Sequence, residues 1–143
     1  MNLEEKRAAL IAELSAIPGG TARLAHVVEL GRGVALPEEL KNDAHRVEGC
    51  LSKLWLVATM RDGRCHFEAD SDSAVVKGIA SLLCRFYSGH TPAEILASEP
   101  GFLAEVGISQ HLTPNRRNGL ARLWDKMRAF ASRQSQGPVL SNQ

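Results

Sequence analysis

The chain has 143 residues, of which 44% are hydrophobic and 23% are charged. This length fits one domain, and this composition is typical of an ordinary globular domain rather than a disordered chain. The 17 basic residues nearly cancel the 16 acidic ones, which leaves a net charge of +1. Because no strong field would draw such a chain to nucleic acid or to an anionic membrane, we expect neither among its partners.

The three cysteines exclude a disulfide framework, since their number is odd and no Cys-x-x-Cys motif occurs. Their presence as thiols favours a reducing compartment. The first residues, Met1–Lys6, include two glutamates where a signal or transit peptide would be basic. The longest uncharged apolar run, Leu54–Met60, is too short to cross a bilayer. We therefore predict a cytoplasmic location.

The first third of the chain predicts two helices and a loop. Apolar residues recur at three- and four-residue steps over 3–17, which is the spacing of an amphipathic helix that stops at Pro18. Thr21 is the expected N-cap of a second helix, and Gly31 is its expected end. The segment 34–45 has mixed charge and little periodicity, which indicates a surface loop.

A β-hairpin is predicted next. The run 54–59 is rich in β-branched, aromatic and apolar residues, and 64–70 follows as a return strand. Between them stands Asp62-Gly63, a pair that tolerates the positive φ angles of a tight hairpin turn. Because 54–59 is almost entirely apolar, we expect both of its faces to be covered and the strand to lie centrally in its sheet.

Helical patterns return in the last half of the chain. Residues 70–73 can each cap a helix, and a broad apolar face follows. Further helices are predicted at 92–97, at 102–106, and from Thr113-Pro114 onward, while 134–143 is predicted to be a frayed tail. The whole pattern predicts one α+β domain over residues 1–143, in which helices pack on a small antiparallel sheet of about three strands in two layers.

Cys50 is the thiol best placed for chemistry. It follows Gly49, whose backbone can turn sharply, and it precedes the predicted central strand, so a loop could present it to a partner. The alternative is a buried structural cysteine. Cys65 and Cys84 fit packing positions, and Cys65 and His66 would face opposite sides of a strand, so no metal site is predicted.

Three further residues are candidates for positioning the loop or contacting a partner. His45 stands five residues before Cys50 and could shuttle a proton, or it could simply be solvated. Asp72 most simply caps the third helix. Arg116 lies in the first turn of the last helix, where positive charge is unfavourable, and this points to a carboxylate or persulfide partner.

Three stretches together resemble the SufE family, the sulfur acceptors that work with cysteine desulfurases in iron–sulfur cluster assembly. They are Val47–Trp55 (VEGCLSKLW), Asp70–Ile79 (DSDSAVVKGI) and Gln110–Arg116 (QHLTPNR), in the family's order and spacing. The sequence departs from the family at Leu51 and Lys53, where glutamine is usual, so partner affinity or choice could differ.

The resemblance implies an activity and a site. Cys50 would take sulfane sulfur from the persulfide of a pyridoxal-phosphate desulfurase, which is SufS-like or CsdA-like, and pass it to an iron–sulfur scaffold complex. Removing that sulfur would stimulate the desulfurase. The chain itself would carry no cofactor and would act as a sulfurtransferase-like carrier without independent turnover. We expect its Cys50 loop to be turned toward an apolar pocket at rest and to swing out when the desulfurase docks.

Two alternatives stay open at this point. One is a metal-binding scaffold like the NifU/IscU proteins, whose fold the SufE family resembles, and the other is an interaction module in which Cys50 is incidental. A homodimer is also left open.

Overall fold

Two antiparallel strands joined by a tight turn form the sheet of the computed structural model, which describes the backbone of residues 1–141 and the side chains of residues 1–135. β1 (Leu54–Arg61) pairs along its whole length with β2 (Arg64–Ser71). Asp62 and Gly63 connect them with φ angles of 53° and 76°. Both angles are positive, as a two-residue hairpin turn requires, so the hairpin prediction is confirmed.

The sheet has two strands rather than about three. Each strand makes one more antiparallel contact with a neighbouring segment, and both contacts are isolated bridges: Arg46 pairs with Trp55, and Cys65 pairs with His90. The segments that contribute Arg46 and His90 leave the sheet after a single pairing. The position of β1 is therefore less central than its apolar sequence predicted, because beyond Trp55 only β2 continues alongside it.

The helices lie close to the positions that the sequence predicts. The segment expected as a loop contains two short 3-10 helices, and a third precedes the last helix. In chain order the helical elements are α1 (Leu3–Ser15), α2 (Gly20–Leu30), η1 (Glu38–Leu40), η2 (Asp43–His45), α3 (Ala74–Tyr87), α4 (Pro92–Leu96), α5 (Phe102–Glu105), η3 (Ser109–His111) and α6 (Pro114–Ser141).

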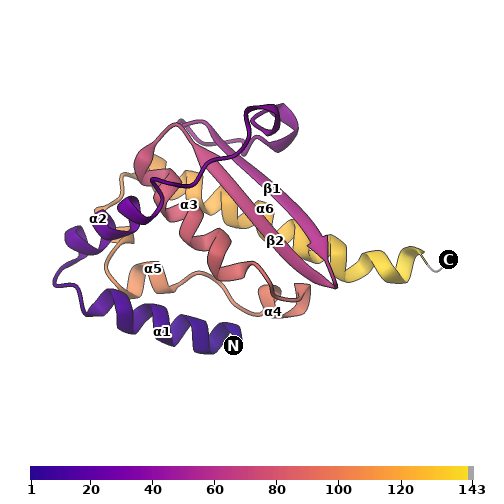
Figure 1. Cartoon of the computed structure of the whole chain (residues 1–143), viewed down its shortest axis with the longest axis horizontal. Helices are drawn as coiled ribbons and strands as arrows, with labels where there is room; N and C mark the ends of the chain where they lie inside the picture. The colour runs from indigo at the N-terminus through magenta and orange to yellow at the C-terminus, as the bar shows by residue number, and fades with distance from the viewer. Residues whose placement is uncertain (142–143) are drawn as a thin grey trace.

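The architecture is α+β with two layers, as predicted. Figure 1 shows the hairpin crossing α6, with α3 beside it and α1, α2 and α5 toward the other end of the molecule. The core lies between the sheet and α3 and α6. At its centre the ring of Tyr87 in α3 stacks on Trp124 in α6 with centroids 4.9 Å apart, and its hydroxyl donates to the Ser98 carbonyl at 2.7 Å. These contacts fix α6 against α3 and the sheet.

Glycine allows α2 and α3 to cross in close contact. A Cβ atom built on Gly78 would lie 2.7 Å from the Cα atom of Val28 and 3.0 Å from the carbonyl oxygen of Val27. Since both obstacles are backbone atoms, no side chain could turn aside to make room. The missing side chain of Gly78 therefore sets the spacing of the two helices.

A buried carboxylate anchors the segment before β1. Asp70, which is 3% exposed, accepts a hydrogen bond from the backbone N–H of Leu36 at 3.0 Å, and Lys41 and Lys77 approach its oxygens within 3.1 and 3.5 Å. Burial alone would raise the pKa of Asp70, but the Leu36 and Lys41 hydrogen bonds outweigh it and lower the pKa below its ordinary value. The carboxylate thus ties the loop region to β2.

The last helix extends further than the sequence indicated. Gly137 and Pro138 suggested a tail from residue 134, whereas the backbone of α6 stays helical to Ser141. The final two residues of that predicted tail, 142–143, lie outside the described residues.

Candidate functional site

Cys50 lies on a loop that is closed at its base. The backbone N–H of Val47 donates to the carbonyl of Leu54 at 2.8 Å, and Arg46 pairs with Trp55 directly behind this bond. Residues 48–53 therefore leave and re-enter the structure at neighbouring points. Gly49 has φ +82°, a conformation that other residues rarely adopt, and it turns the chain just before the cysteine.

Asp72 and Ser71 hold the returning arm of this loop. The backbone N–H of Lys53 donates to Asp72 Oδ1 at 2.9 Å, and the Lys53 carbonyl accepts from the Ser71 hydroxyl at 2.6 Å and from the Asp72 N–H at 3.2 Å. The cap of α3 is Ser73, whose side chain accepts from the Val76 N–H. The simplest interpretation of Asp72, as a helix cap, is therefore wrong, and its side chain contacts the Cys50 loop instead.

The thiol of Cys50 rests against α6. Cys50 is half-buried and packs on the edge of the core, while Gly119 of α6 is buried. The three atoms nearest to a Cβ built on Gly119 all belong to Cys50, and its Sγ would overlap with that Cβ. The thiol thus occupies the space that any other residue at position 119 would fill.

Two arginines flank this contact on α6. Arg116 lies three positions before Gly119 and Arg122 three positions after it, so each is a neighbour of Gly119 on the helix surface. The stem of Arg122 lies beside Gly49, with its Cγ 3.3 Å from the position of a Cβ on that glycine. From the sequence Arg122 looks like part of a solvated helix face, and nothing near Gly119 marks it; only the fold brings both to the Cys50 loop.

His45 is tied to its own segment. Its Nδ1 lies 2.9 Å from the Leu40 carbonyl oxygen, so that ring nitrogen donates to the backbone. Within the part of the chain whose side chains are described, no hydrogen bond joins the ring to Cys50. Its predicted part in proton transfer stays a prediction.

The other two thiols are buried. Cys65 is 0% exposed and Cys84 is 4% exposed. Burial raises the pKa of Cys65, and burial together with the charge of Glu68 raises the pKa of Cys84 to about 12. Since the thiolate is the nucleophile, neither group is reactive near neutral pH.

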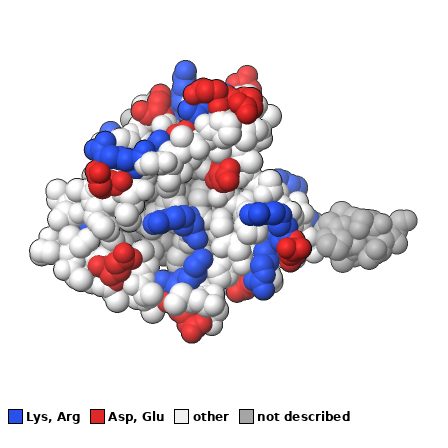
Figure 2. All heavy atoms as spheres, viewed as in Figure 1, with Lys and Arg blue, Asp and Glu red and all other residues white. Residues whose placement is uncertain are grey.

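The neighbour of Cys50 is an exposed apolar side chain. Leu51 is 81% exposed, although large apolar side chains usually pack inside. Figure 2 shows one face of the molecule, on which lysine and arginine side chains are interspersed with aspartate and glutamate, and neither sign covers that face. The loop tip thus offers a thiol and one apolar contact to a partner.

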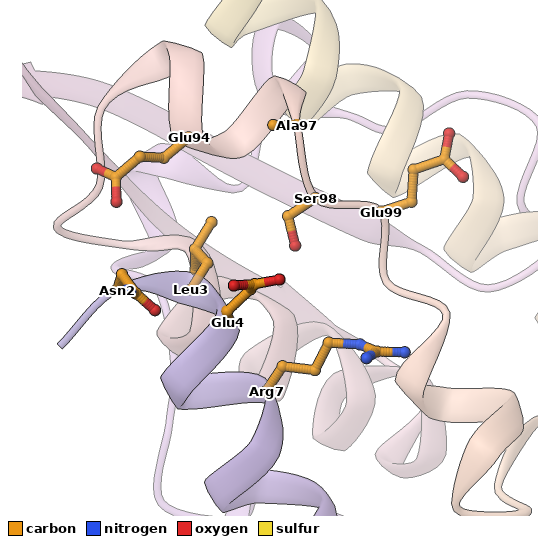
Figure 3. A pocket seen from close by; sticks show the side chains of 8 residues that line it. All are labelled: Asn2, Leu3, Glu4, Arg7, Glu94, Ala97, Ser98 and Glu99. Carbon is orange, nitrogen blue, oxygen red and sulfur yellow. The ribbon is translucent and has the colours of Figure 1, made fainter.

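The hollow shown in Figure 3 lies elsewhere. It measures about 460 Å³ and is lined by the start of α1 and its N-cap and, on and after α4, by Glu94, Ala97, Ser98 and Glu99. Its Arg7 is already paired with Glu105 of α5. None of its lining residues belongs to the Cys50 loop or to α6, so this hollow has no part in the site.

Two kinds of feature do not occur in the described residues. No three side chains of the histidine, cysteine, aspartate and glutamate types gather there in a metal-binding arrangement. None of the helices described is both long enough and apolar enough to cross a membrane.

Comparison with known structures supports the fold. The solution structure of a hypothetical protein from Thermus thermophilus superposes with a TM-score of 0.73 at 22% identity, over 92% of this chain and 96% of that one. At this identity the likeness concerns the fold alone.

Two curated relatives are more similar in sequence. An uncharacterised SufE-like protein of Synechocystis is 38% identical over 94 residues, which are 66% of this chain and 59% of that protein. SufE-like protein 1, chloroplastic/mitochondrial, of Arabidopsis thaliana is 39% identical over 97 residues, 67% of this chain and 26% of that protein. The matched region is thus less than two thirds of the length of either relative.

The family comparison covers most of the chain. The domain described as SufE, Fe-S metabolism associated domain, matches residues 8–131. This range includes the Cys50 loop, β1, β2 and α6 as far as Ala131. The chain belongs to the SufE family.

Proposed function

We propose that this protein is a sulfur carrier that receives sulfane sulfur on Cys50 from a cysteine desulfurase and delivers it to an iron–sulfur scaffold. The observation that carries the proposal is the contrast among the three thiols. Cys50 is partly accessible at the tip of an anchored loop, whereas Cys65 and Cys84 are buried. Membership of the SufE family supports a role in sulfur transfer for iron–sulfur metabolism.

The transfer is a thiol exchange without net oxidation. The Cys50 thiol first releases its proton to solvent. Its thiolate then attacks the outer sulfur of the desulfurase persulfide, the S–S bond of that persulfide breaks, and the desulfurase cysteine leaves as a thiolate that takes up a proton. The product is a persulfide on Cys50, which loses its outer sulfur to the next acceptor by the same exchange.

Two arginines of α6 lie close in sequence to the glycine against which Cys50 rests. Arg116 and Arg122 stand three positions on either side of this Gly119. A persulfide on Cys50 is anionic, and a guanidinium group brought close to it during transfer would stabilise it; the guanidinium of Arg122 is paired with Asp125. Arg116 is thus proposed as an electrostatic and positioning residue, and Asp72 as the residue that fixes the loop's returning arm.

The partners follow from the reaction. The donor is a pyridoxal-phosphate cysteine desulfurase of the SufS-like or CsdA-like kind, which turns over faster once its own cysteine is free of sulfur. The acceptor is an iron–sulfur scaffold complex. The exposed side chain of Leu51 offers the donor an apolar contact next to the reacting thiol. A cytoplasmic location belongs to this proposal; the name of the Arabidopsis relative places that protein in chloroplasts and mitochondria.

Mass spectrometry of cysteine variants tests the proposal. After incubation with a desulfurase and cysteine, the wild-type protein should gain about 32 Da, the mass of one sulfur atom, on the peptide that contains Cys50. Cys50→Ser should gain nothing and should not stimulate the desulfurase. Cys65→Ser and Cys84→Ser are the matched controls and should accept sulfur like the wild type. Sulfur on the Cys50→Ser protein, with normal stimulation, would refute the assignment.

A further inference from the structure

Helix propensity alone does not explain the glycine at position 119. It lies inside α6, where glycine is less favourable than alanine because its backbone loses more freedom on folding. Gly78 in α3 has an explanation in the backbone of α2, which passes within 2.7 Å of where its Cβ would be. At Gly119 the obstacle is not backbone of a crossing helix but the side chain of one residue.

That residue is Cys50 alone. The Sγ, Cβ and Cα atoms of Cys50 are the three nearest to a Cβ built on Gly119, the latter two at 3.3 and 4.0 Å, and Sγ would overlap with it. An alanine at 119 could therefore be accommodated only if the Cys50 side chain moved away from α6. The glycine leaves a space whose one occupant is the thiol.

We propose that Gly119 is the positioning residue of Cys50: its missing side chain forms a seat that holds the thiol against α6. With the thiol seated, the backbone of α6 blocks one side of Sγ against small thiols and oxidants. The consequence for sulfur transfer rests on the carrier function proposed above, but the seat itself does not.

The loop can leave this seat without disturbing the rest of the fold. At its tip the loop meets α6 through the thiol at Gly119 and the flexible stem of Arg122 beside Gly49, and just before the loop Lys126 of α6 donates to the Arg46 carbonyl at 2.9 Å. Its base is held separately, by the Val47–Leu54 hydrogen bond and by Asp72 on Lys53. The tip can therefore swing while its base and α6 stay where they are.

The first test is the reactivity of the thiol in the protein alone. We expect Gly119→Ala to raise the rate at which iodoacetamide alkylates Cys50 about tenfold, which corresponds to about 1.4 kcal/mol against the seated position. Cys65 and Cys84 are buried and report general loosening, so their alkylation rates should not change. Gly101→Ala is the matched control, because a Cβ there meets nothing within 4 Å and its φ is −65°.

The second test asks whether the two residues are coupled. In the wild-type background Gly119→Ala should lower the Tm or leave it unchanged, since overpacking cancels the gain in helix propensity. In a Cys50→Gly background the same change should raise the Tm, because nothing then occupies the seat. Should Gly119→Ala fail to fold, Cys50→Gly is expected to rescue it.

These outcomes separate the seat from the carrier function. Three results would refute the proposal that Gly119 positions Cys50. They are unchanged alkylation of Cys50, equally faster alkylation of all three cysteines, and a Tm effect of Gly119→Ala that is the same in both backgrounds. If these tests confirm that Gly119 positions Cys50 while wild-type Cys50 never gains sulfur from a desulfurase, the carrier function is refuted and the positioning role of Gly119 is not. If both hold, persulfide loaded on Gly119→Ala should be lost to glutathione about tenfold faster than from the wild type.

Discussion

Removing the Asp72 side chain tests how the Cys50 loop is anchored. Asp72→Ala deletes the one acceptor of the Lys53 N–H, which lies 2.9 Å from Asp72 Oδ1. Asp72→Asn is the matched variant, because its amide oxygen can still accept this hydrogen bond while the negative charge is gone. Comparing the two separates the hydrogen bond from the charge.

The expected cost is small and local. Both partners are exposed, so water replaces the lost acceptor, and the loss amounts to about 1 kcal/mol. The Lys53 carbonyl keeps its bonds from the Ser71 hydroxyl at 2.6 Å and from the Asp72 N–H at 3.2 Å, which use no atom of the deleted side chain. The loop base should therefore open more often without unfolding, and about 1 kcal/mol corresponds to about a fivefold change in the open fraction.

Hydrogen exchange measured by NMR reports how often the loop base opens. The Lys53 amide should exchange about fivefold faster in Asp72→Ala, near wild-type rate in Asp72→Asn, and the amides of β1 beyond Leu56 should not change. Lys53 exchange that is unchanged in Asp72→Ala would show that the hydrogen bond does not hold the loop. Equal acceleration in both variants would show that the charge matters and the acceptor does not.

Two further predictions concern the frame around the site. Gly78→Ala should destabilise the protein by about 1–2 kcal/mol in urea unfolding, because the overlap with backbone atoms of Val27 and Val28 outweighs the gain in helix propensity; a more stable variant would contradict this. Asp70→Asn should cost about 2 kcal/mol at pH 7, where the buried carboxylate is ionised and bound by the Leu36 N–H. Because the folded-state pKa of Asp70 lies below its ordinary value, its contribution is complete above the ordinary pKa and is lost as the pH falls through the folded one. The difference in unfolding free energy between wild type and Asp70→Asn should therefore shrink as the pH falls below the ordinary aspartate pKa, and a difference that stays constant with pH would contradict the assignment.

Features with a local cause could be predicted from the sequence. The turn at Asp62 and Gly63 depends on positive φ angles at two adjacent residues, and the start of α4 on a capping box between Thr91 and Glu94. In both cases the residues that make the interaction are within three positions of each other. Cys50 was found in the same way, from the glycine before it and the strand after it.

Features that depend on contacts between distant segments could not be predicted from the sequence. Asp72 looks like a helix cap in sequence, and only the approach of Lys53, 19 residues away along the chain, gives its carboxylate another partner. Gly119 and Cys50 are separated further still, and nothing near either residue indicates the other. The missing third strand has the same origin, since whether a segment stays beside β1 or leaves after one pairing depends on tertiary packing.

In the proposed transfer, the closed base of the Cys50 loop limits how far sulfur carried on Cys50 would travel. Cys50 stands three positions beyond Val47, so even a fully extended chain lets it move only about 10 Å from the base of the Cys50 loop. A donor and an acceptor that both use this short tether must come within the same small radius of one spot. They would therefore bind the protein one after the other rather than together. Sulfur transfer would then require the donor to dissociate before the acceptor binds.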